Sequence, residues 1–354
     1  MDRKPPSRRA RRFALIAAAA LIALVAGHAL LWRAMAEQLE AGWQSWVQLR
    51  RAHGWQVEHA PPVRGGWPLA ATLSVDRLRL DGAAATLPGG VTLAVQRAVL
   101  RVELPWLDRL QVALPGQQRL RLGATEFPFT ADTLTATVPL ERDTLPNTAE
   151  LAAERLRIGL PGGGVELATA RLIVRGSASA TEAEPALELN LFAEGLDLPP
   201  AVPGDPLARF GRRIATLSAE LALSGPLPSG RAPAARAEAW RDGGGTLELR
   251  GLGLRWGPLG GMAAATLAFD EALQPMGAGT LRLSGAAEAL EAMAEAGLIG
   301  RRAAATARGV LPLLSRPSAQ DGKPEIEVPL TLEDRTLSLA RIPVMRFAPL
   351  EWPR

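Results

Sequence analysis

The chain of 354 residues contains no cysteine and no tyrosine, and it has only three histidines. Without cysteine it can form no disulfide, thiolate nucleophile, cysteine-ligated zinc site or iron–sulfur cluster. The absence does not indicate a compartment, because proteins without disulfides occur on both sides of a membrane. Apolar residues make up 47% of the chain and charged residues 21%, so the sequence can bury a core and is not disordered throughout.

The positive charge is confined to one end of the chain. Residues 1–12 hold six basic residues and one acidic residue, a net charge of +5, whereas the remainder holds 34 basic and 35 acidic residues. A nucleic-acid-binding protein would carry its basic residues as a patch or stripe on the folded domain. The sequence therefore predicts no nucleic-acid partner, and a basic tail at 1–12.

Residues 13–32 form an uncharged apolar run with the length of a membrane span. Twenty helical residues extend about 30 Å, the thickness of the hydrocarbon core. We expect a single-pass transmembrane helix, with the basic tail in the cytoplasm and the rest exported. Ala34-Met35-Ala36 also fits a signal-peptidase site, so cleavage after Ala36 remains an alternative. The residues expected to anchor the helix are Phe13, Leu15, Leu21, Leu24, Leu31 and Trp32.

Apolar residues at helical spacing continue through 33–53, which predicts a juxtamembrane amphipathic helix that ends at Gly54. Five of the nine tryptophans fall within the first 67 residues. Because indole rings favour the lipid headgroup region, we expect an interface belt there. The alternative is that these rings pack into the core of the exported domain. The residues assigned to the belt are Trp43, Trp46, Trp55 and Trp67.

After Gly54 the hydrophobic period changes from helical to two, as in Arg77-Leu78-Arg79-Leu80. This alternation is typical of antiparallel sheet with one dry face and one wet face. We therefore predict a mainly β fold for residues 54–354, with a few helices and long curved antiparallel sheets in a groove or sandwich. The candidate apolar sheet face is Leu73, Val75, Leu78, Leu80, Leu120, Leu122, Leu156, Ile158, Leu247, Leu249, Leu281 and Leu283.

Other local patterns predict the remaining elements. Helices are expected at 206–213, 232–241, 286–296 and 301–311, and strands at 326–332 and 337–344 with a turn around 333–335. The Pro-rich stretch 199–206 is the one candidate boundary between two lobes.

Catalytic patterns are scarce. The chain has no Gly-x-Ser-x-Gly elbow, Ser-x-x-Lys or Gly-Lys-Ser/Thr sequence. If 55–59 is a strand, Glu58 faces away from His59, and His53 lies on the other side of Gly54, so the two histidines do not predict a three-ligand metal site. Glu325 and Glu327 have a spacing common on any wet strand. The glycine clusters at 162–164 and 243–245 precede strands and so predict hairpin turns, not phosphate loops. We expect no catalytic residue, metal or cofactor, and no enzyme.

Two motifs carry a resemblance to a known family. RGGWPLAATL at 64–73 and LPWLDRLQVALPGQQRLRL at 104–122, together with Gly54-Trp55 after an N-terminal membrane helix, resemble the proteobacterial domain-of-unknown-function family numbered 2125. The resemblance covers most of 13–354 and implies an envelope protein that faces the periplasm. The chain is also similar, more distantly, to AsmA-like envelope proteins, whose sheets form lipid-holding grooves. No motif implies active-site residues.

These patterns favour a non-enzymatic protein anchored in the inner membrane, with its main domain in the periplasm. A one-sided sheet must cover its dry face, either in a closed core or by curving into a trough that holds acyl chains. Membrane lipid, or another envelope component, is the expected ligand. An envelope scaffold that binds other proteins is the alternative, and a hydrolase is a third hypothesis. The sequence does not indicate the oligomeric state.

Overall fold

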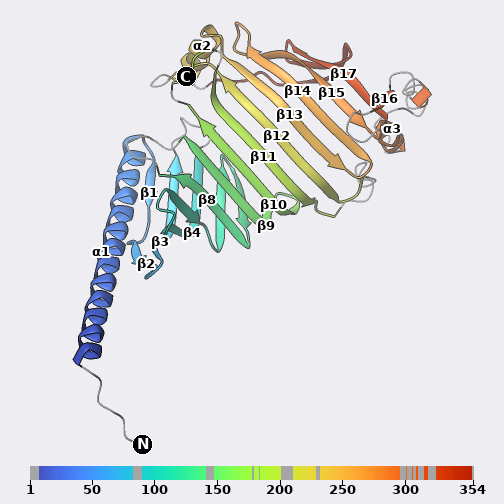
Figure 1. Cartoon of the computed structure of the whole chain (residues 1–354). Helices are drawn as coiled ribbons and strands as arrows, with labels where there is room; N and C mark the ends of the chain where they lie inside the picture. The colour runs from blue at the N-terminus through green and yellow to red at the C-terminus, as the bar shows by residue number, and fades with distance from the viewer. Residues whose placement is uncertain are drawn as a thin grey trace, which may run out of the picture.

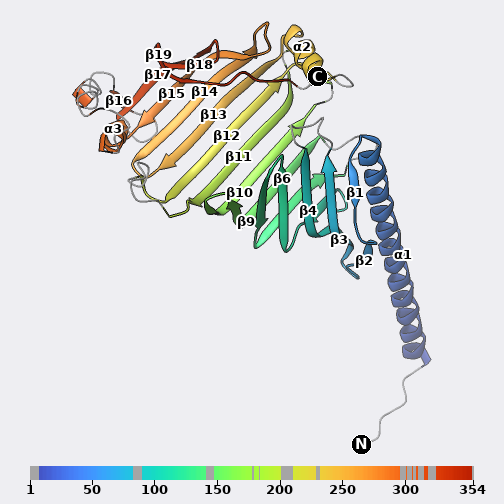
Figure 2. The ribbon, with the colours of Figure 1, turned by 180° about the vertical axis from the view of Figure 1, so that it is seen from behind.

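In the part of the chain that the structure describes, one long antiparallel sheet has three helices at its margins (Figure 1). The computed structural model describes residues 8–82, 90–140, 147–177, 179–182, 184–200, 210–228, 232–295, 300, 305, 308–309, 315–317 and 324–352. The mainly β fold predicted from the sequence is confirmed. Within these residues the strands form a single antiparallel sheet, and Figures 1 and 2 show no second sheet stacked on it.

One uninterrupted helix, α1 (Arg8–Ala52), contains both of the helices expected at the N-terminus. It ends where Gly54 adopts a φ of +83°, a conformation that glycine reaches without steric cost. Of the predicted basic tail, residues 8–12 are the first turns of α1 and residues 1–7 lie outside the described part of the chain. Within that part, α1 is the one helix long and apolar enough to cross a membrane.

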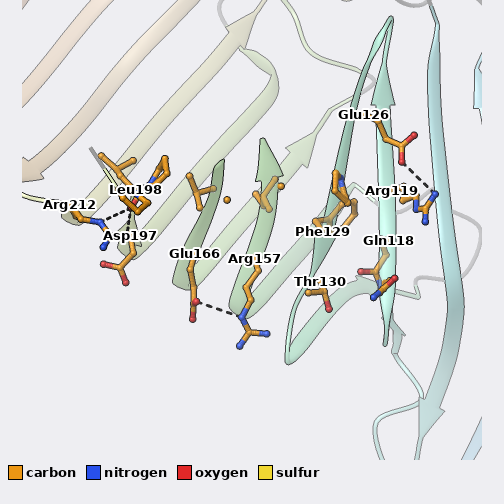
Figure 3. Close-up of a pocket in the computed structure, with 18 residues that line it drawn as sticks. Gln118, Arg119, Glu126, Phe129, Thr130, Arg157, Glu166, Asp197, Leu198 and Arg212 are labelled. Carbon is orange, nitrogen blue, oxygen red and sulfur yellow. Dashed lines mark hydrogen bonds and ion pairs between the residues drawn. The ribbon is translucent and has the colours of Figure 1, made fainter. Parts of the chain in front are cut away.

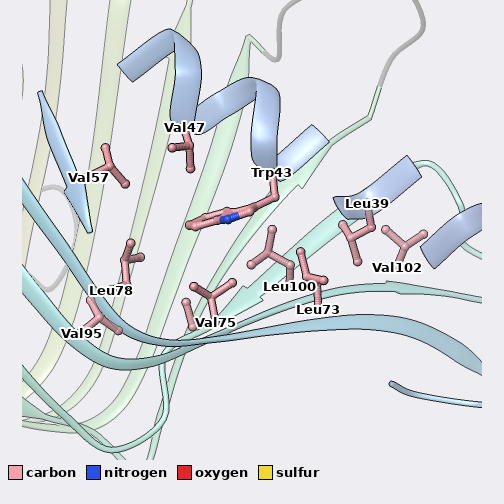
Figure 4. Close-up of a cluster of buried hydrophobic side chains, with 11 residues drawn as sticks. Leu39, Trp43, Val47, Val57, Leu73, Val75, Leu78, Val95, Leu100 and Val102 are labelled. Carbon is pink, nitrogen blue, oxygen red and sulfur yellow. The ribbon is translucent and has the colours of Figure 1, made fainter. Parts of the chain in front are cut away.

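The two halves of α1 have different surroundings. The anchor side chains from Phe13 to Leu31 are exposed, and Phe13 retains 73% of its accessible surface. Farther along, Leu39, Trp43 and Val47 are buried against β1 (Gln56–Glu58), β3 (Ala70–Gly82) and β4 (Val91–Glu103) (Figure 4). The second half of α1 is therefore part of the domain core, whereas the side chains of the first half are mostly exposed and meet the domain near its end, where His28 lies 2.7 Å from O of Pro68.

The sheet is mostly a meander: most strands pair antiparallel with the strand before or after them in the chain, but some ladders join strands that are not consecutive, such as β1 with β3. The remaining strands are β2 (Val63–Gly65), β5 (Arg109–Ala113), β6 (Gln117–Leu122), β7 (Thr125–Thr130), β8 (Thr133–Pro139), β9 (Thr148–Leu160), β10 (Gly163–Gly176), β11 (Pro185–Asp197), β12 (Arg213–Ser224), β13 (Thr246–Trp256), β14 (Leu259–Phe269), β15 (Pro275–Ser284), β16 (Ser315–Pro317), β17 (Pro324–Glu333), β18 (Thr336–Leu339) and β19 (Ile342–Arg346). Short tight turns connect most of them. The glycine cluster at 162–164 lies at the turn between β9 and β10, as predicted, whereas the cluster at 243–245 follows a helix that ends at Asp242 and makes no hairpin.

Irregular residues interrupt the ladders of several consecutive strands. Arg77 and Arg155 have φ values of +52° and +46°, and the pairing of β4 passes from β5 to β6 opposite Gly116. Such bulges bend a strand and increase its twist. The first strands follow the axis of α1, whereas β11–β14 are inclined to it (Figure 2). We attribute this change of direction to the row of bulges.

The minor elements match the sequence unevenly. Helices α2 (Pro233–Asp242) and α3 (Ala286–Glu295) and strand β17 lie where they were predicted. The helix expected at 206–213 is wrong where it is described, because Arg213 begins β12, and most of 301–311 lies outside the described residues. The strand expected at 337–344 is split into β18 and β19. Strands β11 and β12 pair across the stretch 199–206, so it does not divide the sheet.

An ion pair between Arg79 and Asp81, at the end of β3, allows an electrostatic contribution to stability to be tested. Asp81 accepts a hydrogen bond from Nε of Arg79 at 2.7 Å, which lowers the pKa of its carboxyl below the ordinary 3.8. Because the folded pKa is lowered, this stabilisation is present above pH 3.8 and disappears as the pH falls through the folded value. We expect Asp81→Asn to cost at most about 1 kcal/mol at neutral pH and nothing at the lowest pH. Denaturant unfolding at several pH values measures this, and the exposed Glu182→Gln is the matched control.

Candidate functional site

From β9 onward, one face of the sheet is apolar. From β9 to β18 the residues that pair across the strands form three continuous rows of the same kind. Since side chains alternate between faces, all three rows lie on one side. The rows are Leu151, Leu172, Leu191, Ala219, Leu252, Ala263, Leu281 and Val328; Val174, Leu189, Leu221, Leu249, Ala265, Gly279, Leu330 and Leu339; and Leu187, Leu223, Leu247, Leu267, Gly277, Leu332 and Leu337. We call these residues the apolar face.

The opposite side of the same strands carries charges that pair between strands, either directly adjacent or, for Arg250 and Glu188, across the strand between them. The pairs are Arg171–Glu150 at 2.6 Å, Arg250–Glu188 at 2.8 Å and Arg282–Glu327 at 3.1 Å. Their side chains are about half exposed, so this side suits contact with water. The sheet is therefore amphipathic in the direction perpendicular to its plane.

The apolar face has little cover in the described part of the chain. Helix α1 packs on β1, β3 and β4, and α2 and α3 each contact β14. At one end of these strands the C-terminal segment also adds cover, because the ring of Trp352 packs on that of Phe269 with centroids 5.3 Å apart. Figures 1 and 2 show no further layer over the middle of β10–β15. Leu252 retains 40% of its accessible surface and Leu151 retains 37%, while the leucines between them are half-buried by one another. A contiguous leucine surface of eight strands, about 35–40 Å wide at the usual strand spacing, marks an interaction site.

The predicted face residues fall into two groups. Leu73, Val75 and Leu78 are fully or almost fully buried under α1, so they belong to the protein core. The residues from β13 and β15, such as Leu249 and Leu281, lie on the uncovered part. The sequence analysis missed the alternating residues of β10, β14 and β17 as face members. Their period of two was visible, but in β14 small residues such as Ala263 and Ala265 weakened the pattern.

The predicted tryptophan belt is partly wrong. Trp43 is 6% exposed and lies in the core, stacked on Trp46 with ring centroids 5.2 Å apart, and Trp55 also packs against that cluster. For these three rings the alternative of core packing is the one found, because α1 turns this side toward the sheet. Trp67 is 48% exposed and is the one member of the predicted belt that remains at a surface.

A second candidate is an open cavity of about 710 Å³ beside β7, β9 and β10 (Figure 3). Its wall includes Phe129, Ile158 and Val165. Most of the charged groups around it already have a partner: Arg119 lies 3.6 Å from Glu126, Arg157 lies 3.6 Å from Glu166, and Arg212 donates to O of Leu198. Because most of these charges are already bound within the protein, the cavity offers a ligand less than the apolar face does.

The three histidines all contact backbone carbonyl oxygens. Nε2 of His28 lies 2.7 Å from O of Pro68, and His53 and His59 hydrogen-bond to carbonyls close to them in sequence. In the part of the chain that the structure describes, no three His, Asp or Glu side chains gather closely enough to hold a metal ion. Glu327 is paired with Arg282 on the charged side of the sheet.

Comparison with known proteins identifies one match. The family model described as "Uncharacterized protein conserved in bacteria (DUF2125)" matches residues 32–348, nearly the whole chain and every strand. No curated protein and no solved structure matches.

Proposed function

The chain belongs to the bacterial family DUF2125, and the match spans both the second half of α1 and the entire sheet. We therefore propose one function in which α1 and the sheet act together. The protein is an envelope protein held in the inner membrane by α1, and it binds the acyl chains of lipids on its apolar face. It performs no catalysis. The observation that carries the proposal is the continuity of the apolar face through eight strands with little protein cover.

Charge and contact support a retained anchor with the sheet on the periplasmic side. Six basic residues precede the span, and such residues stay in the cytoplasm. Trp32 donates a hydrogen bond from Nε1 to O of Ala70 at 2.9 Å, and His28 contacts Pro68. Cleavage after Ala36 would remove both contacts. Intact-mass measurement of the mature protein tests this, since a start at Glu37 would contradict retention.

The chemistry of the apolar face matches acyl chains better than a soluble ligand. Leu, Val, Ala and Gly provide no hydrogen-bond donor or acceptor in their side chains, so the face offers burial of apolar surface alone. A chain tethered to a bilayer has a high local concentration of lipid.

A photocrosslinking pair tests lipid binding with a matched control. Leu252 on the apolar face and Met262 on the charged face lie on neighbouring strands and are 40% and 45% exposed. With a photoreactive amino acid at each position in the full-length protein, in cells, we expect lipid adducts at 252 and few at 262. Mass spectrometry of the adducts identifies the lipid. Equal lipid labelling at the two positions, or none at 252, would contradict the proposal.

The second candidate function, an envelope scaffold, rests on β19. This strand pairs with β18 alone among the described residues, and its Ile342 and Val344 are 68% and 56% exposed. An exposed edge of this kind can add a strand from another chain. The same crosslinker at Ile342 would then capture a stoichiometric protein partner in place of lipid.

A further inference from the structure

Two loops of the domain lie beside α1 at the level where the helix leaves the predicted span. In the loop before β3, Trp67 packs against His28 and Trp32, with ring centroids 5.0 Å and 5.8 Å away. Its backbone turns at Gly66, where φ is +92° and the N–H of Ala70 donates to O of Gly66. The loop after β4 is tied to the first, because N of Leu104 donates to O of Leu69 at 3.1 Å.

The ends of these loops expose large apolar side chains toward solvent. Leu69 is 65% exposed, Trp106 is 55% exposed, and Trp67 and Leu107 are 48% and 43% exposed. We call Trp67, Leu69, Trp106 and Leu107 the apolar tip. Four large apolar residues on two joined loops are more than the single exposed residues that a soluble surface carries.

The position of the apolar tip along α1 indicates what covers it. The helix from Phe13 to Trp32 is about 29 Å long at 1.5 Å per residue, which matches a hydrocarbon core of about 30 Å. His28 and Trp32, which contact the first loop, lie in its last turns. The tip is therefore at the depth of the headgroups and the first acyl carbons. In Figures 1 and 2, β2 lies farther than β1 toward the N-terminal end of α1.

The charges near the tip agree with this depth. Arg33 follows Trp32 directly and pairs with Glu37, while Arg64 binds Glu40 at 2.6 Å. These groups lie beyond the predicted span in the direction of the domain. The apolar rings and leucines of the tip are thus nearer the predicted span, and the partly exposed ion pairs are nearer the domain. This order is the one expected at a membrane interface.

We propose that the apolar tip inserts into the periplasmic leaflet of the membrane that α1 spans, so that the domain is fixed to the bilayer at two places and its sheet keeps a set orientation. The occupant of the tip is the lipid surface itself. The inference rests on the proposed membrane anchor, but it does not depend on lipid binding by the apolar face.

The test uses the absence of native cysteine. Leu69→Cys, Leu107→Cys, Ile22→Cys and Ile342→Cys are introduced one at a time into the full-length protein and labelled with an environment-sensitive fluorophore. The proteins are reconstituted in vesicles of phosphatidylethanolamine and phosphatidylglycerol that contain nitroxide lipids with a shallow or a deep quencher. We expect the labels at 69 and 107 to lose most of their emission to the shallow quencher. The label at 22 should respond to the deep quencher and the label at 342 to neither.

A second substitution controls for local effects of the label. Adding Trp106→Asp should reduce quenching at Leu69→Cys severalfold, whereas Phe192→Asp, which replaces a similarly exposed ring on the charged face, should leave it unchanged. Quenching at 22 without quenching at 69 and 107 overturns the tip and leaves the anchor intact. Absence of quenching at all three positions overturns both.

Discussion

Replacing Trp43 with alanine is expected to destabilise the domain by about 3–5 kcal/mol, the usual cost of truncating a buried aromatic side chain. The ring is 6% exposed, stacks on Trp46 and meets the ring of His59 at a centroid distance of 5.3 Å (Figure 4). It joins α1 to the sheet, so its removal opens a cavity between the two. Denaturant unfolding of the full-length protein in detergent, followed by the release of α1 to limited proteolysis, measures the loss.

Trp43→Phe is the matched control for that measurement. Nε1 of Trp43 is buried and has no hydrogen-bond partner among the described residues, so the indole N–H contributes no bond that phenylalanine would lose. We expect Trp43→Phe to cost less than about 1.5 kcal/mol because most of the apolar volume remains. If alanine and phenylalanine have equally small effects, α1 is not held by this core. The second half of the helix would then be a free juxtamembrane segment.

The sequence was sufficient for the class of the fold because each strand carries its own alternation. The Leu-Arg pattern at 78–80 and the Leu-Glu pattern at 187–189 each identify a strand and its dry face without reference to any partner. The C-terminal end of α1 could also be predicted from nearby residues alone, since Gly54 reaches its positive φ without steric cost. The meander followed from short turns, which join neighbouring strands in sequence.

The sequence could not predict which part of the apolar side of the sheet is covered by α1 and which part is uncovered, because this depends on contacts between segments far apart in the chain. Leu73 and Leu249 have the same pattern of neighbours, but the former lies under α1 and the latter lies on the uncovered rows. The difference depends on where the helix lies across the sheet. The same holds for the tryptophans: Trp43 and Trp67 both follow a glycine, yet packing places one in the core and one in the exposed tip. The hydrophobic period and composition of a helix or strand identify its apolar side, but they do not show which other element, if any, covers that side.

The second large effect is expected at the centre of the apolar face. Ala219 of β12 lies between Leu191 and Leu252, so Ala219→Asp would place a carboxylate among bound acyl chains. A charged side chain at such a depth costs about 2.5–3.5 kcal/mol on insertion scales. Since 1.4 kcal/mol is a factor of ten, lipid binding should weaken by about two orders of magnitude. Lipid that co-purifies with the full-length protein, counted per protein by mass spectrometry, is the readout.

The neighbouring residue separates this effect from damage to the sheet. Ser218 is a small residue on the same strand, but it pairs with Phe192 and Gly253 and faces the charged side. Ser218→Asp adds the same side chain where water solvates it, so we expect normal lipid content and normal stability. Loss of lipid from both variants would indicate a disrupted sheet. Retention in both, with Ala219→Asp folded, would mean that the lipid does not lie on the apolar face. The leucine rows would then have to be covered by protein, as the scaffold hypothesis requires.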